Sequence, residues 1–390
     1  MRLSTRTTSV ATSPIGEAKA WLTQRTNARP LLDLSQAAPS YPPAPEIAAR
    51  IAEVATSHDG GAYAPTMGLP ALKEAFAERL RTDTGSSVTA DQVLPTAGCN
   101  QAFCLAVSAL ADPGDEIIVP LPYYFNHTMW LEAEGIVPRF LEPDANFVPS
   151  PADAEKLINE RTRAIVLVTP GNPTGATFPP EVINAFAQLA ARSGIALIID
   201  ETYRNFRPTS APAHQAMVGD AWADTVISLH SFSKDLAIPG YRVGAIVAGE
   251  GFVEQASKLL DCVTICAPRI SQEAAVTGLL TADAWRQTQA DRIAANLEVF
   301  RSMMATAPGS FELAASGAFF GWVRHPFESL TSADVVKHLV LDHDVLVIPG
   351  TAFMPTDDRW LRFSFANLDA SELAELANRL SECGDSLATR

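Results

Sequence analysis

The feature that most constrains the fold is an alternation of short apolar runs with helical segments across the middle of the chain. Runs rich in Ile, Val and Leu predict strands over 117–119, 136–141, 164–168, 196–200, 226–229 and 243–247. Helical segments lie between most of them, such as Glu181–Arg192, whose start is marked by Pro179 and Pro180. Because such apolar strands are buried on both faces, the pattern predicts a largely parallel sheet covered by helices on both sides.

The pattern changes towards both ends of the chain. A proline-rich stretch over 39–45 predicts an extended arm that enters a first helix near Glu46. After about residue 285, a long helix over 283–307 is followed by short strands and further helices, which is typical of an α+β unit. We therefore expect an arm with part of the small domain over 1–45, a large domain over 46–285 and a small domain over 286–390.

The composition narrows the classes of function. Lys and Arg number 29 against 44 Asp and Glu, a formal charge of −15 that disfavours binding to nucleic acid. No apolar run approaches the ~18 residues of a membrane span, so no membrane partner is expected. The five cysteines are few and odd in number, which favours a reducing compartment, and we expect a cytoplasmic location. Cys262 and Cys266 would share one helix face as buried thiols, and no metal site is predicted.

Polar residues follow three successive predicted strands. Asp200 ends the strand over 196–200, Asn172 lies just after the preceding strand, and Lys234 follows the next one in Ser231-Phe232-Ser233-Lys234. Ligands of open α/β sheets bind at the carboxyl ends of the strands, so these groups should converge on one site. Each also has a simpler interpretation as a turn or cap residue. Ser231 and Lys234 match a short serine-acylase pattern, but the partner motifs of that class are absent.

Taken together and in order, these motifs resemble the class I/II aminotransferases of the fold-type I pyridoxal 5′-phosphate (PLP) enzymes. The resemblance runs from about Asp33 to Phe365. It implies a large domain with a mostly parallel seven-stranded sheet covered by helices, plus a smaller α+β domain, and it implies PLP as the cofactor.

The resemblance assigns the catalytic groups. Lys234 matches the Schiff-base lysine, which also carries the proton between the substrate and the cofactor. Asp200 matches the carboxylate that pairs with the pyridine nitrogen and keeps the ring an electron sink. Asn172 and Tyr203 match the residues that hydrogen-bond the phenolic oxygen of the cofactor.

The phosphate ligands are implied in the same way. The backbone of Ala97, Gly98 and Cys99 precedes a predicted helix over 100–110, whose N-terminus can bind an anion. The matching side-chain ligands are Ser231, Ser233 and Arg242. Tyr124 matches an aromatic residue stacked on the pyridine ring, with Tyr123 as the neighbouring candidate. Tyr63 matches a tyrosine that reaches the phosphate of the partner subunit, which implies a homodimer with a shared active site.

The resemblance also implies how the substrate is bound. Arg362 matches the arginine that binds the substrate α-carboxylate with its planar fork, with Asn172 beside it. Ala37 or Ala38 stands where many relatives carry a glycine, and Ala38 is taken as the substrate contact. Asn100 stands where some aspartate-using relatives have a lysine, which weakens a dicarboxylic preference. The apolar segment 345–353 resembles a pocket-lining loop and favours aliphatic or aromatic amino acids.

The leading prediction is an aminotransferase that moves the amino group of an amino acid to a 2-oxo acid in a ping-pong cycle. The first alternative is a PLP-dependent β-lyase, which removes the same α-proton but expels a leaving group from the β-carbon. A second alternative is a cofactor-retaining regulator, for which residues 1–30 are too short to form the usual DNA-binding segment. A serine acylase built on Ser231 and Lys234 is a third alternative.

Overall fold

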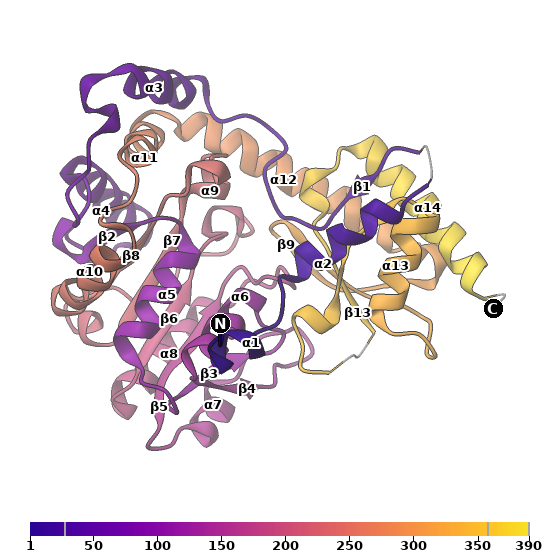
Figure 1. The fold of residues 1–390 in the computed structure, drawn as a ribbon, viewed down its shortest axis with the longest axis horizontal. Coiled ribbons are helices and arrows are strands. Elements are labelled where there is room, and N and C mark those ends of the chain that lie inside the picture. The colour runs from indigo at the N-terminus through magenta and orange to yellow at the C-terminus, as the bar shows by residue number, and fades with distance from the viewer. Residues whose placement is uncertain (27–28, 357–358, 389–390) are drawn as a thin grey trace.

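The computed structural model describes residues 1–26, 29–356 and 359–388 of the 390-residue chain, which form two lobes of unequal size (Figure 1). The larger lobe holds a seven-stranded sheet in the order β2-β8-β7-β6-β5-β3-β4. Only β8 runs antiparallel to its neighbours. The strands are β2 Val93–Thr96, β3 Glu116–Pro120, β4 Val137–Leu141, β5 Thr162–Val168, β6 Ala196–Asp200, β7 Val226–Ser231 and β8 Gly244–Val247.

Helices cover both faces of this sheet because its strands are apolar on both faces. Along β6, Leu197 and Ile199 pack into one hydrophobic cluster, whereas Ile198 packs into another on the opposite side. Side chains alternate along a strand, so each β6 residue stabilises one of the two layers. The helices of the large lobe are α3 Pro45–Thr56, α4 Pro70–Thr84, α5 Cys99–Leu110, α6 Phe125–Glu134, α7 Pro151–Leu157, α8 Pro180–Ser193, α9 Phe232–Asp235, α10 Glu250–Thr264 and α11 Arg269–Thr281.

Proline and glycine mark where several of these helices begin and end. Pro70 and Pro180 occupy the first helical positions of α4 and α8, where a missing N–H costs nothing. Gly85 and Gly194 follow the last residues of the same helices with φ of 68° and 65°. This left-handed conformation is open to glycine without a steric cost, so both helices end there.

The smaller lobe is built on an antiparallel sheet in the order β12-β13-β10-β9. Its strands are β9 Glu312–Gly317, β10 Phe320–Arg324, β12 Ile348–Pro349 and β13 Trp360–Phe363, and its helices are α12 Asp283–Met304, α13 Ser332–Asp342 and α14 Ala370–Ala388. β1 (Leu32–Asp33) pairs in parallel with β11 (Val345–Leu346), which joins the N-terminal arm to this lobe. The predicted α+β character is confirmed.

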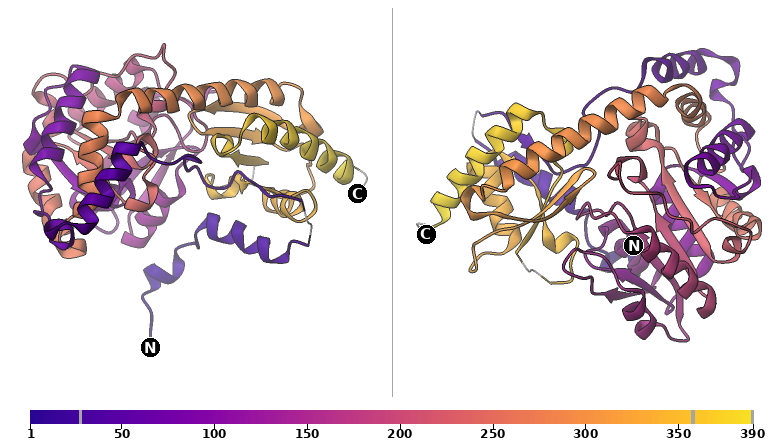
Figure 2. Two further views of the ribbon diagram at one scale, coloured as in Figure 1. Left: turned by 90° about the horizontal axis from the view of Figure 1, so that it is seen from above. Right: turned by 180° about the vertical axis from the view of Figure 1, so that it is seen from behind.

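The N-terminal segment carries two short helices, α1 (Thr5–Ser9) and α2 (Pro14–Ala20), and runs over the surface of the molecule (Figure 2). Ala18 of α2 packs with Phe125 of the large lobe and with Trp322 of the small lobe. Helix α12 bridges the two lobes, and the predicted boundary at residue 285 falls within its first turn. Short 3-10 helices occupy Trp21–Gln24, His58–Gly61, Ala90–Gln92, Arg204–Phe206, Ala221–Asp224, Pro239–Tyr241, Pro308–Ser310, Gly350–Ala352 and Phe365–Asn367.

The structure adds three strands that the sequence pattern did not indicate, namely β1, β2 and β9. β2 is only four residues long and contains Pro95, which is tolerated because β2 lies at the edge of the sheet. β9 is rich in alanine and glycine, residues with low strand propensity, and it is held by pairing with β10.

The expectation that two cysteines share a helix face is wrong. Helix α10 ends at Thr264, and Ile265 adopts a φ of 65°, so Cys266 lies beyond the helix. Cys262 is exposed, whereas Cys266 is buried. Among the described residues, no helix has both the length and the apolar character needed to cross a membrane.

Candidate active site

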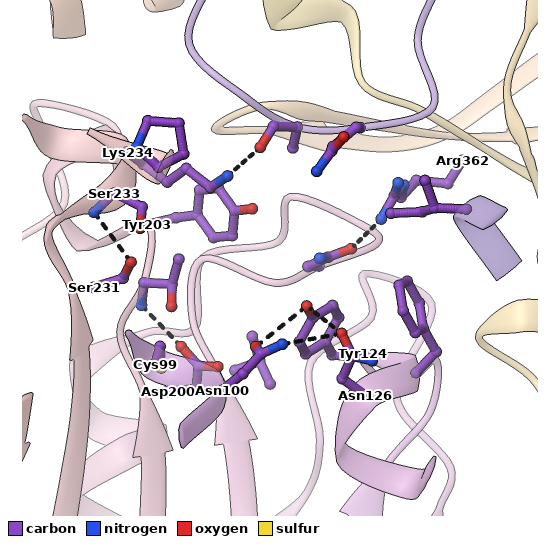
Figure 3. Close-up of a pocket in the computed structure, with 18 of the residues that line it drawn as sticks. Cys99, Asn100, Tyr124, Asn126, Asp200, Tyr203, Ser231, Ser233, Lys234 and Arg362 are labelled. Atoms are coloured by element: carbon purple, nitrogen blue, oxygen red, sulfur yellow. Dashed lines mark hydrogen bonds between the residues drawn. The ribbon is translucent and has the colours of Figure 1, made fainter. Parts of the chain in front are cut away.

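The polar groups predicted at the strand ends converge on one cavity of about 420 Å³. Asp200 is the last residue of β6, Asn172 follows β5, and Lys234 lies on α9 directly after β7. Figure 3 shows Lys234 and Arg362 on opposite sides of this cavity, with Asp200 at its base. The predicted site residues that line it are Cys99, Tyr124, Asn172, Asp200, Tyr203, Ser231, Ser233, Lys234, Arg242 and Arg362.

Asp200 is a buried carboxylate held by two donors. Its side chain is 5% exposed, its Oδ1 accepts a hydrogen bond of 2.9 Å from the backbone N–H of Thr202, and its Oδ2 lies 3.3 Å from Nε2 of His127. Burial alone would raise the pKa of Asp200, but the contacts with His127 and Thr202 outweigh it and lower that pKa. His127 is itself fixed by stacking on Phe103, with ring centroids 3.8 Å apart. The carboxylate therefore stays ionised and oriented.

Lys234 is a lysine whose amine is easily neutralised. Burial, with the neighbouring charges of Arg242 and Arg362, lowers its pKa to about 8. Its Nζ donates to the carbonyl oxygen of Ala37, which lines the cavity. The backbone N–H of Ala38 donates instead to Oδ1 of Asn367 at 3.3 Å. A neutral amine can act as a nucleophile or a base at mild pH. Ala37, and not the predicted Ala38, therefore lies at the cavity wall beside this amine.

Arg362 presents a fixed guanidinium to the same cavity. The residue is 2% exposed; its Nη1 donates to Oδ1 of Asn172 at 3.0 Å, and its Nη2 donates to the carbonyl oxygen of Ser35. The guanidinium carbon lies 4.9 Å from the ring centre of Phe353 and 5.3 Å from that of Phe320. Burial lowers the pKa of Arg362 to about 10, so the side chain remains a cation suited to a carboxylate.

The N-terminus of α5 and Arg242 form a cradle for an anion. Gly98 precedes the first helical residue with a φ of 88°, and a Cβ built on it would lie 2.5 Å from Nη2 of Arg242. Only glycine lets the guanidinium come so close to this helix end, where positive partial charge gathers. Ser231 and Ser233 lie beside it on the cavity wall, and the Oγ of Ser231 accepts the backbone N–H of Ser233 at 3.2 Å.

These groups fit PLP. A phosphate suits the cradle at Gly98 and Arg242, a protonated pyridine nitrogen suits the ionised Asp200, and an aldehyde suits the neutral amine of Lys234. Ala97 precedes the cradle, and its backbone N–H donates to Oε1 of Gln101 at 2.6 Å.

Two tyrosines line the cavity as neutral phenols. The hydroxyl of Tyr124 donates to Oδ1 of Asn126 at 2.8 Å, and burial raises the pKa of Tyr124 to about 12. Burial also raises the pKa of Tyr203, whose ring packs against Phe320. Tyr123 instead stacks on Phe140, so Tyr124 is the tyrosine of this pair that faces the cavity.

Some predicted residues lie outside the cavity, and some lining residues were not predicted. Tyr63 is 75% exposed, and its carbonyl oxygen accepts a hydrogen bond from Arg269 at 3.2 Å. Phe353 of the predicted pocket loop is buried behind Arg362 rather than at the cavity surface. The unpredicted lining residues are Ser13, Ile15, Gln36, Phe125, Asn126, Val168, Thr202 and Pro239. The contact of His127 with Asp200 was also not predicted, although His127 lies on α6 about one helical turn after Tyr124.

Comparison with known proteins places this cavity in a family. The chain matches the family model for aminotransferases of class I and II over residues 29–380. It is 29% identical to an aromatic aminotransferase of Arabidopsis thaliana over 97% of this chain and 95% of the relative. It is 31% identical to an aspartate/prephenate aminotransferase of Thermus thermophilus over 75% of this chain and 76% of the relative.

A solved structure of a Thermus thermophilus aspartate aminotransferase mutant superimposes on the chain with a TM-score of 0.90. That alignment has 26% sequence identity and covers 98% of this chain and 100% of the other. Together with the geometry of Asp200, Lys234 and Arg362, these matches show that the chain belongs to the class I and II aminotransferases, PLP-dependent enzymes that move amino groups from amino acids to 2-oxo acids.

Proposed function

We propose that this aminotransferase acts on α-amino acids with uncharged aliphatic or aromatic side chains, with Lys234 as the proton carrier and Arg362 as the carboxylate ligand. The observation that carries the proposal is that the Lys234 amine and the Arg362 guanidinium line one cavity from opposite sides (Figure 3). An α-amino acid has one carboxylate and one reacting α-carbon, and this arrangement offers one basic group to each of them.

Different residues of the cavity bind different parts of the cofactor. PLP, when bound, supplies an electron sink that stabilises the negative charge left on the substrate α-carbon. Asp200 keeps a proton on the pyridine nitrogen, because its own pKa is lowered and its orientation is fixed by His127 and Thr202. Arg242, with Ser231, Ser233 and the N–H groups at the start of α5, binds the phosphate.

Lys234 moves the proton during catalysis. With PLP bound, the Lys234 amine, whose pKa is lowered to about 8, would take the proton from the substrate α-carbon and return it to the cofactor carbon that carries the amino nitrogen. The amino acid then leaves as its 2-oxo acid after water is added. A second 2-oxo acid takes up the amino group through the same steps in reverse, so Lys234 ends each cycle as it began.

The preference for uncharged substrate side chains follows from the basic residues that line the cavity. The three basic residues on the described part of the cavity wall are Lys234, Arg242 and Arg362, and each has a role above. Beside Tyr124 the wall carries two neutral amides, Asn100 and Asn126, and Nδ2 of Asn100 donates to Oδ1 of Asn126 at 3.2 Å. A second carboxylate of aspartate or glutamate would lie there without a cation, at a cost of several kcal/mol if desolvated.

A panel of amino donors tests this specificity. We expect kcat/KM for phenylalanine or leucine to exceed that for aspartate at least about tenfold, a difference of about 1.4 kcal/mol. The variant Asn100→Lys should narrow this ratio by adding a cation, whereas Cys262→Ser, on the exposed end of α10, should leave it unchanged. A preference for aspartate in the unmodified enzyme would contradict the proposed substrate class.

We also propose a homodimer with a shared active site. Tyr63 is exposed in the single chain, and its loop lies beside the end of α10, where Val263 and Ile265 are exposed as well. Apolar and aromatic side chains gathered in this way are typical of a surface that a partner covers. In such a dimer Tyr63 would reach the phosphate cradle of the second subunit.

Subunit mixing tests the shared site. Lys234→Ala and Tyr63→Ala subunits, each poorly active alone, should regain activity when they are denatured and refolded together, because each hybrid dimer contains one site with both residues intact. Two Lys234→Ala preparations mixed in the same way serve as the control. If mixing restores no activity while hybrid dimers are detected by mass, Tyr63 does not act across the interface.

A cytoplasmic location is the last part of the proposal. It is supported by the five cysteines, all of which are unpaired. Fractionation of the source cells, followed by assay of the transaminase activity in the cytosol and in the other fractions, tests it. Activity confined to an oxidising compartment would contradict it.

A further inference from the structure

Two histidines and a cysteine meet in the small lobe, apart from the active-site cavity. His338 lies on α13, His343 directly follows that helix, and Cys383 lies on α14. A nitrogen from each histidine and the cysteine sulfur all lie within 4.8 Å of one another. The three side chains are almost or fully buried. Three ligands that transition metals favour are thus gathered from two helices.

The spacing of the two rings matches a tetrahedral metal site. Nε2 of His338 lies 3.3 Å from Nε2 of His343. A zinc ion bound at about 2.0–2.1 Å to two nitrogens in tetrahedral geometry holds them about 3.3 Å apart. Oγ of Ser386 lies 2.8 Å from Nε2 of His338 and 3.3 Å from Nε2 of His343, so a fourth oxygen group stands beside the two rings.

Carboxylates stand behind both histidines. Oδ2 of Asp342 lies 2.6 Å from Nδ1 of His338, and Oε2 of Glu382 lies 3.6 Å from Nδ1 of His343. Glu382 is held in turn by Arg29 at 2.9 Å. Histidines that bind metals commonly direct their other nitrogen to a carboxylate, which fixes the ring and makes it a better ligand. Asp342 lies within hydrogen-bond distance of Nδ1 of His338, so a proton held there would leave Nε2 of His338 as an electron-pair donor, whereas Glu382 lies near His343 at ion-pair distance only.

We propose that His338, His343 and Cys383 form a binding site for a divalent transition metal, with Zn²⁺ as the best fit. Two nitrogens and one sulfur suit zinc, whereas Mg²⁺ and Ca²⁺ require oxygen ligands. On binding, the thiol proton of Cys383 is released to solvent and a zinc–sulfur bond replaces it, without a change of oxidation state. The bound ion would tie the end of α13 to α14 and act as a structural cross-link.

Metal titration of the PLP-loaded enzyme tests the site directly. After removal of metals with a chelator, Zn²⁺ should bind to one tight site per chain, measured by competition with a chromophoric chelator. Cys383→Ser and His343→Gln should each weaken binding at least about 100-fold, and Asp342→Asn, which removes only the supporting carboxylate, should weaken it about 10- to 100-fold. Cys262→Ser removes an exposed thiol elsewhere and serves as the matched control.

A second measurement needs no variant. Co²⁺ bound to the unmodified enzyme should give, as a difference spectrum against the metal-free holoenzyme, the intense visible bands of tetrahedral cobalt and a thiolate charge-transfer band. Zinc should also raise the unfolding temperature of the unmodified enzyme more than that of His343→Gln. The proposal is overturned if the difference spectrum lacks the thiolate band, or if Cys383→Ser binds zinc as tightly as the unmodified enzyme.

Discussion

Replacement of His127 by phenylalanine isolates the contact that orients Asp200. Phenylalanine keeps a ring that can stack on Phe103 but removes the nitrogen that lies 3.3 Å from Oδ2 of Asp200. The carboxylate then keeps the backbone N–H of Thr202 and loses its other named donor. Because the carboxylate is buried, the lost contact is not replaced by bulk water.

The magnitude follows from the type of contact. A hydrogen bond to a charged group contributes about 1.5–3 kcal/mol, and 1.36 kcal/mol corresponds to one pKa unit. We therefore expect the pKa of Asp200 to rise in His127→Phe, and kcat/KM to fall about 10- to 100-fold. The lowered pKa of Asp200 in the unmodified enzyme stabilises the fold above the unfolded pKa, and this contribution is lost as the pH falls through the folded pKa. In the variant that loss begins at higher pH.

The assay is the pH dependence of kcat/KM for a good amino donor, with the cofactor at saturation. The acid side of the profile should move to higher pH in His127→Phe, while His127→Gln, which retains a side-chain N–H, should move it less. An unchanged acid side, together with an unchanged rate, would show that His127 does not control the charge of Asp200.

Three further predictions concern the cofactor and substrate ligands. Gly98→Ala should raise the Kd of PLP at least about tenfold, because alanine at φ 88° costs about 1–2 kcal/mol and its Cβ displaces Arg242. Equilibrium dialysis measures this Kd, and an unchanged value would mean that the Gly98–Arg242 cradle does not bind the phosphate. The rate at which Lys234 captures PLP should rise with pH and level off above about pH 8, since only the neutral amine reacts; a stopped-flow rate that is flat from pH 6 to 9 would contradict the lowered pKa. Arg362→Lys should raise the KM of amino acids about 100-fold and leave amines without a carboxylate little changed, because lysine keeps the charge but loses the planar fork; equal effects on both substrates would mean that Arg362 does not bind the carboxylate.

Much of the fold follows from local patterns in the sequence. The predicted strand over 196–200 matches β6, and the helix predicted over Glu181–Arg192 is α8, one residue longer at each end. Such segments combine a clear apolar period with proline or glycine at their ends, so local propensity and tertiary packing agree. β2 and β9 lack that agreement, because β2 contains a proline and β9 contains small residues, which have low strand propensity. Both segments become strands through pairing with a neighbour, β2 with β8 and β9 with β10.

The candidate site was predicted wherever a functional group ends a strand. Asp200, Asn172 and Lys234 follow successive strands of the chain, and a parallel sheet brings such positions together. Ser13 and Ile15 reach the cavity only because the N-terminal segment folds over both lobes, a long-range contact with no local signal. The choice between Ala37 and Ala38 was equally out of reach, since it depends on which alanine faces Lys234.

The small-lobe cluster illustrates the same limit. His338 and His343 lie five residues apart and Cys383 forty residues further on, a spacing that matches no common metal motif. The end of α13 and the packing of α14 bring the three together, and neither is encoded locally. The strand pattern therefore predicts the groups that the sheet orders, whereas it gives no signal for this cluster, which the packing of helices orders.

The most direct test of the account is the position of the cofactor on the chain. Borohydride reduction of the PLP-loaded enzyme, followed by digestion and peptide mass spectrometry, should find the cofactor mass on Lys234 alone. The same treatment after addition of phenylalanine, without a 2-oxo acid, should find Lys234 unmodified and one equivalent of 2-oxo acid in solution. Cofactor attached to another lysine, or a Lys234 adduct that persists while no oxo acid forms, would contradict the assignment of Lys234 as the residue that binds PLP and moves the proton.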